Sequence, residues 1–368
     1  MKKRLKERDR IVVLLIVPSL STGGGEKLVF ELAKGVDRSR FEINVVSLYG
    51  KQCNNKEKVI EDIGIKIYYL NKSPGFDFRT LLKLRRLVNK INPNVIHSHL
   101  DVLIYLLPCY KRNQIKLHTV HSMASFEASG VHRIVRIFAF KVLKVIPVAI
   151  GETVRKSIAQ QYGINEQTIP CIYNGAPLPK ITNSKITNES NKFVIISVGT
   201  LYRIKNYELL INAVSICINE SNLDIELRIV GDGEDREKLN SLIKELGMEE
   251  SIKLLGWREN VYEELKKADV YVCSSLIEGV SISIIEAMMM GLPIIASNVG
   301  ANPDLVKDGV NGILFESENI IDLKKAIIRL VEDSEYRHLL AEGAYSESSK
   351  FDIKNCVKKY EQLYKAKQ

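Results

Sequence analysis

The sequence predicts an α/β protein of two domains, each built on a parallel sheet. Three observations support this prediction. The 368 residues suffice for two domains of ordinary size, each with its own core. Strand and helix patterns alternate through both halves, as is typical of parallel sheets joined by helices. Between the halves, Pro177–Asn191 is polar without a sustained apolar period, which indicates an interdomain linker.

Composition narrows the class of protein. A hydrophobic fraction of 45% and a charged fraction of 26% are typical of a soluble globular protein. The six cysteines are scattered without a C-x-x-C pair, which favours buried free thiols in a reducing compartment over a disulfide framework or a zinc site.

The N-terminal stretch resembles a secretion signal only superficially. Basic residues up to Arg10 precede the apolar run Ile11–Leu20, but the run is short and a glycine-rich loop follows it instead of a cleavage site. No apolar run approaches the roughly 20 residues that span a bilayer. We therefore expect a cytoplasmic protein that is not integral to a membrane.

Charge is divided unevenly between the halves. Residues 1–190 contain 31 Lys and Arg against 15 Asp and Glu, and residues 191–368 contain 22 against 29. The net charge of +9 therefore divides into +16 and −7. Nucleic acid or an anionic membrane surface would each explain the basic half.

The first half begins with a strand, a glycine-rich loop and a helix. Ile11–Val17 is a buried strand pattern, Ser21–Lys27 the loop, and Leu28–Lys34 the helix. Glycines let backbone N–H groups approach a phosphate, although neither the G-x-G-x-x-G nor the Walker spacing is present. Further expected elements are strands at Ile43–Leu48, Ile65–Leu70 and Val95–Ser98, and a helix at Phe78–Ile91.

Two helix patterns concentrate the positive charge. Phe78–Ile91 has a basic stripe, and His132–Pro147 combines a wide apolar face with basic residues in one arc. They are either solvated helices packed on a core or contacts to anionic lipid headgroups. Nucleic acid is less favoured because no aromatic residues alternate with the charges. The basic residues are Arg79, Lys83, Arg86 and Lys90 in the first pattern, and Arg133, Arg136, Lys141 and Lys144 in the second.

Four of the six histidines follow strand patterns: His97, His99, His118 and His121. The sequence has neither an H-E-x-x-H motif nor an H-x-x-x-H spacing on a helix, so no histidine pattern indicates a metal site. Loop positions at strand ends favour recognition of sugar hydroxyls instead.

The second half contains the stretch that is richest in candidate functional residues, Glu278–Pro293. A strand at Asp269–Cys273 precedes it, a helix should begin near Ser281, and Gly291 should end that helix. Glu278 then lies just outside the helix N-terminus, where free N–H groups attract a phosphate. Glu286 lies within the helix. The simpler interpretation is one acid before a helix and another solvated on it.

This stretch resembles the signature of the retaining glycosyltransferase family 4, whose members have the two-domain GT-B fold and use nucleotide sugars. The resemblance implies that Glu278 contacts the donor sugar and Glu286 the donor ribose. It further implies that Ser281, Ile282 and Ser283 offer backbone amides to the diphosphate.

Other motifs match the family in the same order along the chain. Gly23 and Gly24 match its GG-x-E, with the second glycine facing the phosphates, and His121 matches a histidine that approaches the donor sugar. Lys205 matches the diphosphate-binding lysine, but Thr200 occupies the position of the arginine. Nearby, Arg203 is the hypothetical substitute. Arg258 falls in a loop that would line the base pocket, and Gly300–Asp304 departs from the usual G-G-x-P-E.

The resemblance implies two Rossmann-like domains facing a central cleft. The expected division is an acceptor domain at 1–176, a linker at 177–191, a nucleotide-sugar domain at 192–345 and a C-terminal helix crossing back at 346–368. The expected reaction moves a hexose or N-acetylhexosamine, with retention, to a lipid-linked saccharide acceptor in surface polysaccharide assembly. Glu278, His121 and Lys205 are the expected catalytic residues. We expect no metal and no cofactor, a UDP rather than a GDP donor, no nucleic acid, and peripheral attachment at the inner face of the membrane.

Alternatives remain open at this point. A nucleotide-sugar epimerase of the same fold would need no acceptor, and a non-catalytic relative would bind the donor without turnover. A nucleic-acid-binding protein would also explain the basic half. Incubation with donor alone, and salt-dependent binding to DNA, would distinguish them.

Overall fold

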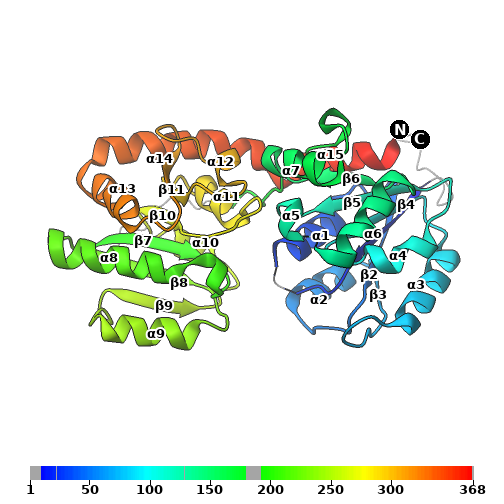
Figure 1. The fold of residues 1–368 in the computed structure, drawn as a ribbon, viewed down its shortest axis with the longest axis horizontal. Coiled ribbons are helices and arrows are strands. Elements are labelled where there is room, and N and C mark those ends of the chain that lie inside the picture. Colours follow the sequence, from blue (N-terminus) through cyan, green and yellow to red (C-terminus); the bar gives the residue numbers. More distant parts are fainter. Residues whose placement is uncertain (1–9, 22, 128, 180–191, 367–368) are drawn as a thin grey trace. The chain divides into compact units, whose positions relative to one another are not determined.

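The computed structural model describes residues 10–21, 23–127, 129–179 and 192–366, in two compact units (Figure 1). Unit 1 comprises the chain up to Gly175 together with the segment from Ile353 onward, and unit 2 is Ala176–Asp352. The expected linker falls mainly on residues 180–191, which lie outside the described residues.

Unit 1 is built on a six-stranded parallel sheet of order β3-β2-β1-β4-β5-β6. This is the strand order of a doubly wound dinucleotide-binding fold, which places ligands at the carboxyl ends of the strands. The strands are β1 Ile11–Val17, β2 Phe41–Ser47, β3 Lys66–Tyr69, β4 Val95–His99, β5 Ile115–Val120 and β6 Ile146–Ala149.

Helices cover both faces of this sheet. Along β1, Val13 and Leu15 pack in the same cluster as residues of α1 and α15, whereas Leu14 and Ile16 pack with residues of α3 and α4. Successive side chains of a strand point to opposite faces, so a continuously apolar strand is buried on both sides. The helices are α1 Gly24–Gly35, α2 Asn55–Asp62, α3 Phe78–Ile91, α4 Leu103–Leu106, α5 Ala124–Glu127, α6 Gly130–Lys141, α7 Glu152–Tyr162 and α15 Ile353–Lys365.

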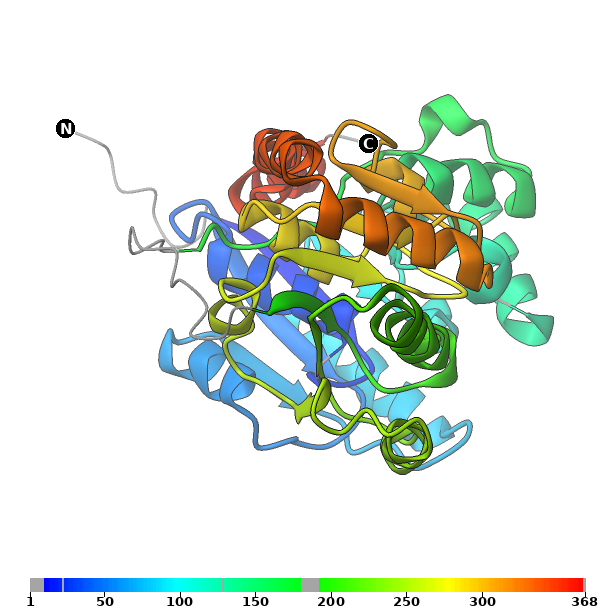
Figure 2. The ribbon, with the colours of Figure 1, turned by 90° about the vertical axis from the view of Figure 1, so that its left-hand side faces the viewer.

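Unit 2 repeats the architecture with a sheet of order β12-β11-β10-β7-β8-β9, again parallel. In Figure 2, α8 (green) and α13 (orange) lie side by side, and both contribute to the core of the unit. Its strands are β7 Phe193–Val198, β8 Ile225–Val230, β9 Ile252–Gly256, β10 Val270–Cys273, β11 Ile294–Ser297 and β12 Gly312–Phe315. Its helices are α8 Tyr207–Ser221, α9 Arg236–Glu245, α10 Tyr262–Leu265, α11 Ile282–Met289, α12 Asn302–Leu305, α13 Ile320–Glu332 and α14 Ser334–Ser348, with a 3₁₀ turn η4 at Arg203–Lys205.

The α/β fold class with two parallel sheets is confirmed, but two local predictions were wrong. The helix expected at His132–Pro147 ends at Lys141, because Lys144 has a positive φ of 56° and Pro147 already belongs to β6. The glycine-rich loop is shorter than expected, since α1 begins at Gly24.

The cysteine prediction was right in part. All six thiols are free, but Cys53 is exposed. Among the described residues, every helix is too short or too polar to cross a bilayer.

Candidate active site

The β10–α11 junction of unit 2 has the geometry expected from sequence. Glu278 precedes α11, whose N-cap is Ser281, and the helix directs Ile284, Ile285 and Met288 into the core. Gly300 adopts a φ of +52° directly behind this turn, and a Cβ there would overlap the Glu278 carbonyl oxygen. The path of the turn therefore depends on a glycine at position 300.

Glu278 forms an ion pair with Lys205 of η4, 73 residues earlier in the chain. Nζ of Lys205 lies 2.5 Å from Oε2 of Glu278, and the two side chains are 20% and 13% exposed. The Ser275 hydroxyl donates a second hydrogen bond of 2.9 Å to Oε2, and the Ser274 hydroxyl donates to the Lys205 carbonyl oxygen at 2.8 Å. The carboxylate and the ammonium group are thus both held in place.

Opposing effects act on the Lys205 ammonium group. Burial is the largest single influence and would lower its pKa, but the attraction and hydrogen bond of Glu278 together raise the pKa above its ordinary value. Lys205 therefore keeps its positive charge at neutral pH, as a group that binds phosphate requires.

The N-terminus of α11 has no side-chain cap. The hydroxyls of Ser281 and Ser283 lie 3.1 Å apart, and Tyr271 donates a 2.8 Å hydrogen bond to Oγ of Ser283. These serines therefore bond within a side-chain network instead of capping the helix, so the amides of the first turn, including that of Ile282, can bind an anion.

Three further donor-site predictions fall in unit 2: Glu286, Arg203 and Arg258. Glu286 is buried within α11, only 5% exposed. Arg203 is exposed on η4, two residues before Lys205. Arg258 follows β9, is 44% exposed, and lies 3.6 Å from Glu264.

In unit 1, Gly23 is the N-cap of α1 and Gly24 its first residue. The Glu26 carboxylate accepts a 3.0 Å hydrogen bond from the Ser21 hydroxyl, and it lies where a Cβ on Gly23 would stand. A side chain at position 23 would therefore displace Glu26 from the start of the helix.

The histidines are mostly interior, so the expectation that they sit in loops was wrong for three of them. His97 and His99 are in β4, His118 is in β5, and all three are fully buried. His97 is bonded through Nδ1 to the Tyr364 hydroxyl and through Nε2 to the Thr119 hydroxyl, both at 2.8 Å. It thereby fastens α15 to the sheet of unit 1.

His121 is the one that follows its strand, directly after β5. Its Nε2 lies 3.1 Å from Nδ1 of His99, while its Nδ1 is shielded from solvent and has no partner among the described residues. Burial, with a contribution from Arg136, lowers the pKa of His121 to about 3. A neutral imidazole with one unpartnered nitrogen suits a hydrogen bond to a sugar hydroxyl.

Sequence reasoning missed the ion pair behind His121. The Glu127 carboxylate accepts a 2.6 Å hydrogen bond from the backbone N–H of His121 and pairs with Arg136 at 2.9 Å. Burial raises the pKa of Glu127 to about 7, although the Arg136 charge opposes the rise. The prediction that Arg136 belongs to a basic surface arc was wrong, since its side chain is 2% exposed. The sequence signal that could have predicted its burial was its position among the apolar residues of α6.

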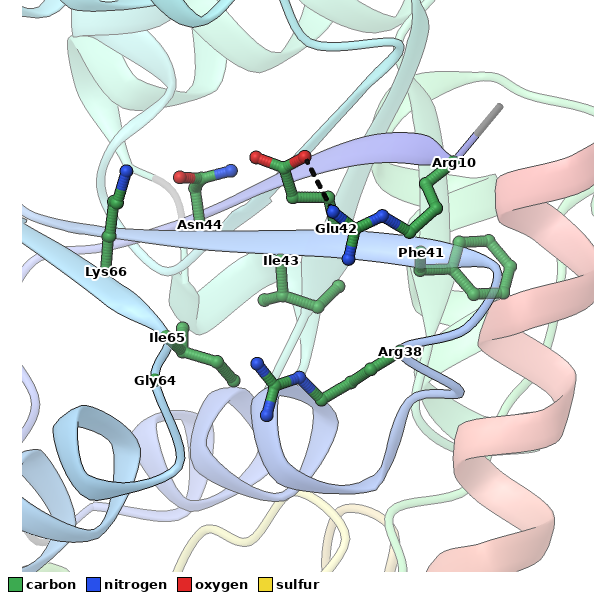
Figure 3. Close-up of a pocket in the computed structure, with 9 residues that line it drawn as sticks. All are labelled: Arg10, Arg38, Phe41, Glu42, Ile43, Asn44, Gly64, Ile65 and Lys66. Atoms are coloured by element: carbon green, nitrogen blue, oxygen red, sulfur yellow. Dashed lines mark ion pairs between the residues drawn. The ribbon is translucent and has the colours of Figure 1, made fainter. Parts of the chain in front are cut away.

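A separate pocket of about 190 Å³ lies at the amino ends of β2 and β3 in unit 1 (Figure 3). Arg10 and Glu42 form an ion pair beside it at 3.7 Å, and Arg38 bonds the Ile63 carbonyl oxygen. The pocket contains none of the predicted site residues and lies at the opposite strand ends from His121.

Comparison with known proteins matches each half of the chain to a glycosyltransferase family model. Residues 22–178 match the model "Glycosyltransferase Family 4", and residues 180–347 match "Glycosyl transferases group 1". Together these matches cover nearly the whole chain.

The sequence identity to individual relatives is low. The chain is 27% identical to a UDP-Gal:alpha-D-GlcNAc-diphosphoundecaprenol alpha-1,3-galactosyltransferase of Escherichia coli, over 98% of each chain. It is 27% identical to the capsular polysaccharide biosynthesis glycosyltransferase CapH of Staphylococcus aureus, over 97% of this chain and 99% of that one. The crystal structure of Anabaena HepE in complex with UDP and glucose has a TM-score of 0.81 at 20% identity, over 96% of this chain and 99% of that chain.

The two sheets, the order of the motifs and the two family matches agree. The chain belongs to the family 4 glycosyltransferases of GT-B fold.

Proposed function

We propose that this glycosyltransferase moves a hexose or N-acetylhexosamine from a UDP-sugar to a lipid-linked saccharide, with retention at the anomeric carbon, in surface polysaccharide assembly. The observation that supports the chemistry most directly is the Lys205–Glu278 ion pair next to the uncapped start of α11. The substrates are proposed from the relatives, which use UDP-galactose and a diphosphoundecaprenol acceptor or act in capsule synthesis.

In this proposal the donor diphosphate competes with Glu278 for the Lys205 ammonium group. Lys205 and the first-turn amides of α11 then stabilise the negative charge that develops on the leaving diphosphate. The displaced Glu278 carboxylate becomes available to the sugar hydroxyls and to the positive charge at the anomeric carbon. Arg203, exposed on the same turn as Lys205, is the proposed second cation.

The bond changes follow from the proposed retention of configuration. The bond between the anomeric carbon and the phosphate oxygen breaks, and the acceptor oxygen attacks the same face. The acceptor proton passes to an oxygen of the leaving diphosphate. His121 is proposed to orient the sugar through its unpartnered Nδ1. Glu286 is proposed to bind the ribose, and Arg258 the base.

One experiment tests the chemistry. The protein is incubated with a panel of UDP-sugars and GDP-sugars, with and without a diphospholipid-linked N-acetylglucosamine acceptor. We expect product only with acceptor, in a UDP-sugar reaction, and the same anomeric configuration by NMR in donor and product. An inverted product would contradict the mechanism, and conversion of donor to an epimer without acceptor would favour an epimerase.

The lipid-linked acceptor also implies a location. We propose that the protein acts as a peripheral protein at the inner face of the cell membrane, where such an acceptor would be extended.

A further inference from the structure

Helix α6 of unit 1 has its apolar and charged sides reversed relative to a helix packed on a core. Val131, Ile134, Phe138 and the adjoining Val142 are between 43% and 68% exposed, whereas Arg136 is 2% exposed. These four apolar residues, which we call the α6 apolar stripe, recur at spacings of three and four and share one side of the helix. Phe126, just before the helix, is 63% exposed as well.

The rotation of α6 about its own axis is fixed from the inside. Arg136 lies 2.9 Å from Glu127 and 3.3 Å from Asp101, while Ala139 and Phe140 are buried. Turning the stripe inward would bring Arg136 into water and leave the buried Glu127 carboxylate without its cation, which is strongly unfavourable. The stripe is therefore exposed in the folded protein.

The charges around the stripe select its partner. Among the residues of α6, Arg133 and Lys141 are exposed, Lys144 follows the helix, and neither Asp nor Glu occurs between Gly130 and Lys144. Two acids contact the helix: Glu127 is paired with Arg136, and Asp101 is paired with Arg136 and lies 3.7 Å from His132. An apolar stripe bordered by cations that form no ion pair within the described part of the chain matches an anionic surface with an apolar interior.

A second helix on the same face of the sheet repeats this charge pattern. α4 contacts both α3 and α6, so the three helices cover one face of unit 1 (Figure 1). α3 has no Asp or Glu, and its cations are exposed: Arg79, Lys83, Arg85, Arg86 and Lys90. Lys83, Arg86 and Lys90 also line an open apolar groove of about 500 Å³ against β3.

We infer that the α6 apolar stripe inserts shallowly into the anionic headgroup region of a membrane, with the cations of α6 and α3 against the lipid phosphates. This inference rests on the proposed function only for the lipid-linked acceptor that such a surface would bring within reach. A second copy of the chain fits less well, because a symmetric contact through α6 would oppose Arg133, Lys141 and Lys144 of both copies.

The test is flotation with vesicles of phosphatidylcholine alone and of phosphatidylcholine with phosphatidylglycerol. The double variant Ile134→Asp/Phe138→Asp is compared with Ile321→Asp/Leu339→Asp, which alters two similarly exposed apolar residues of unit 2. We expect the parent and the control to bind only the anionic vesicles. The stripe variant should bind at least about tenfold more weakly. Arg133→Glu/Lys141→Glu should also weaken binding at low salt.

Two further readouts separate the possible failures. Sugar transfer to the acceptor dispersed in detergent, where no membrane is present, should be equal in the parent and the stripe variant, which shows that the variant is folded; its failure in the parent would overturn the proposed function alone. Equal flotation of the stripe variant and the parent would contradict the inference that the α6 apolar stripe binds the membrane. The proposed membrane surface would also be overturned if sedimentation showed that the parent is a dimer and the stripe variant is not, and if neither protein bound vesicles.

Discussion

The candidate residues of the two units differ in charge at comparable positions, near the carboxyl ends of a parallel sheet. In unit 2, Lys205 and Glu278 form a partly accessible ion pair. In unit 1, the buried His99 and the half-buried His121 are imidazoles with depressed pKa values, and the Glu127–Arg136 ion pair lies behind His121.

Under the proposed function, this difference in charge corresponds to two kinds of ligand group. A diphosphate is best bound by a fixed cation and helix amides. Sugar hydroxyls are best bound by neutral groups that both donate and accept. Each of the following predictions alters one side of this comparison, beginning with the largest expected effect.

Acidification should destabilise unit 1 selectively. His97, His99, His118 and His121 all have pKa values lowered, chiefly by burial, and His97 and His121 reach about 3. A depressed pKa means that the stability these groups contribute is present above the unfolded value near 6.5 and is lost as pH falls below it. At pH 5 the loss is about 2 kcal/mol for each of His97 and His121.

Hydrogen exchange measured at pH 7 and pH 5 distinguishes the units. Protection should fall in β4 and β5 but persist in β7 and β10, because His338, which is exposed, is the histidine of unit 2. The raised pKa of Glu127 acts in the opposite direction, since its contribution is lost as pH rises from about 4.5 to about 7. Equal loss of protection in both units would contradict the comparison.

Removing the cation behind His121 should be the next largest effect. Arg136→Met leaves the Glu127 carboxylate buried without its partner, so we expect a loss of about 3 kcal/mol in the free energy of unfolding at pH 8. The double variant Arg136→Met/Glu127→Gln should recover part of this loss, because no charge is then buried. Urea unfolding measures both, and a double variant no more stable than the single one would be evidence against the ion pair.

Removing the charge of Glu278 in unit 2 should lower turnover, with a smaller loss of stability because Lys205 then lacks its carboxylate partner. Glu278→Gln keeps the shape of the side chain but removes the charge, and we expect kcat to fall by about 10²–10³-fold, as for other groups that stabilise transition-state charge. Glu316→Gln, at an exposed position of the same unit, is the matched control. A Glu278→Gln enzyme with normal kcat would exclude the proposed role.

The smallest expected effect concerns the turn that positions Glu278. Gly300→Ala and Gly309→Ala both place alanine at positive φ, which costs about 1–2 kcal/mol. A Cβ at Gly300 overlaps the Glu278 carbonyl, whereas at Gly309 the nearest heavy atom, the Tyr336 hydroxyl, is 3.9 Å away. Only Gly300→Ala should therefore lower kcat as well. Equal kcat in the two variants would show that the turn tolerates displacement.

The sequence alone was sufficient for the order of elements and for the β10–α11 junction. β1 and α3 were predicted with their observed bounds, and α11 begins one residue after Ser281. These features depend on apolar period, glycine and proline, which act within a few residues. The family resemblance supplied the roles expected of Glu278, Glu286, His121 and Lys205.

Tertiary structure decided which side chains meet and which face water. Lys205 reaches Glu278 because β7 and β10 are neighbours in the sheet, a pairing that no local pattern contains. Helical periodicity placed Arg136 with the exposed cations, but Glu127 and Asp101 draw it inward and turn the apolar stripe outward. A helix buries the side whose partners are present, and those partners come from distant parts of the chain.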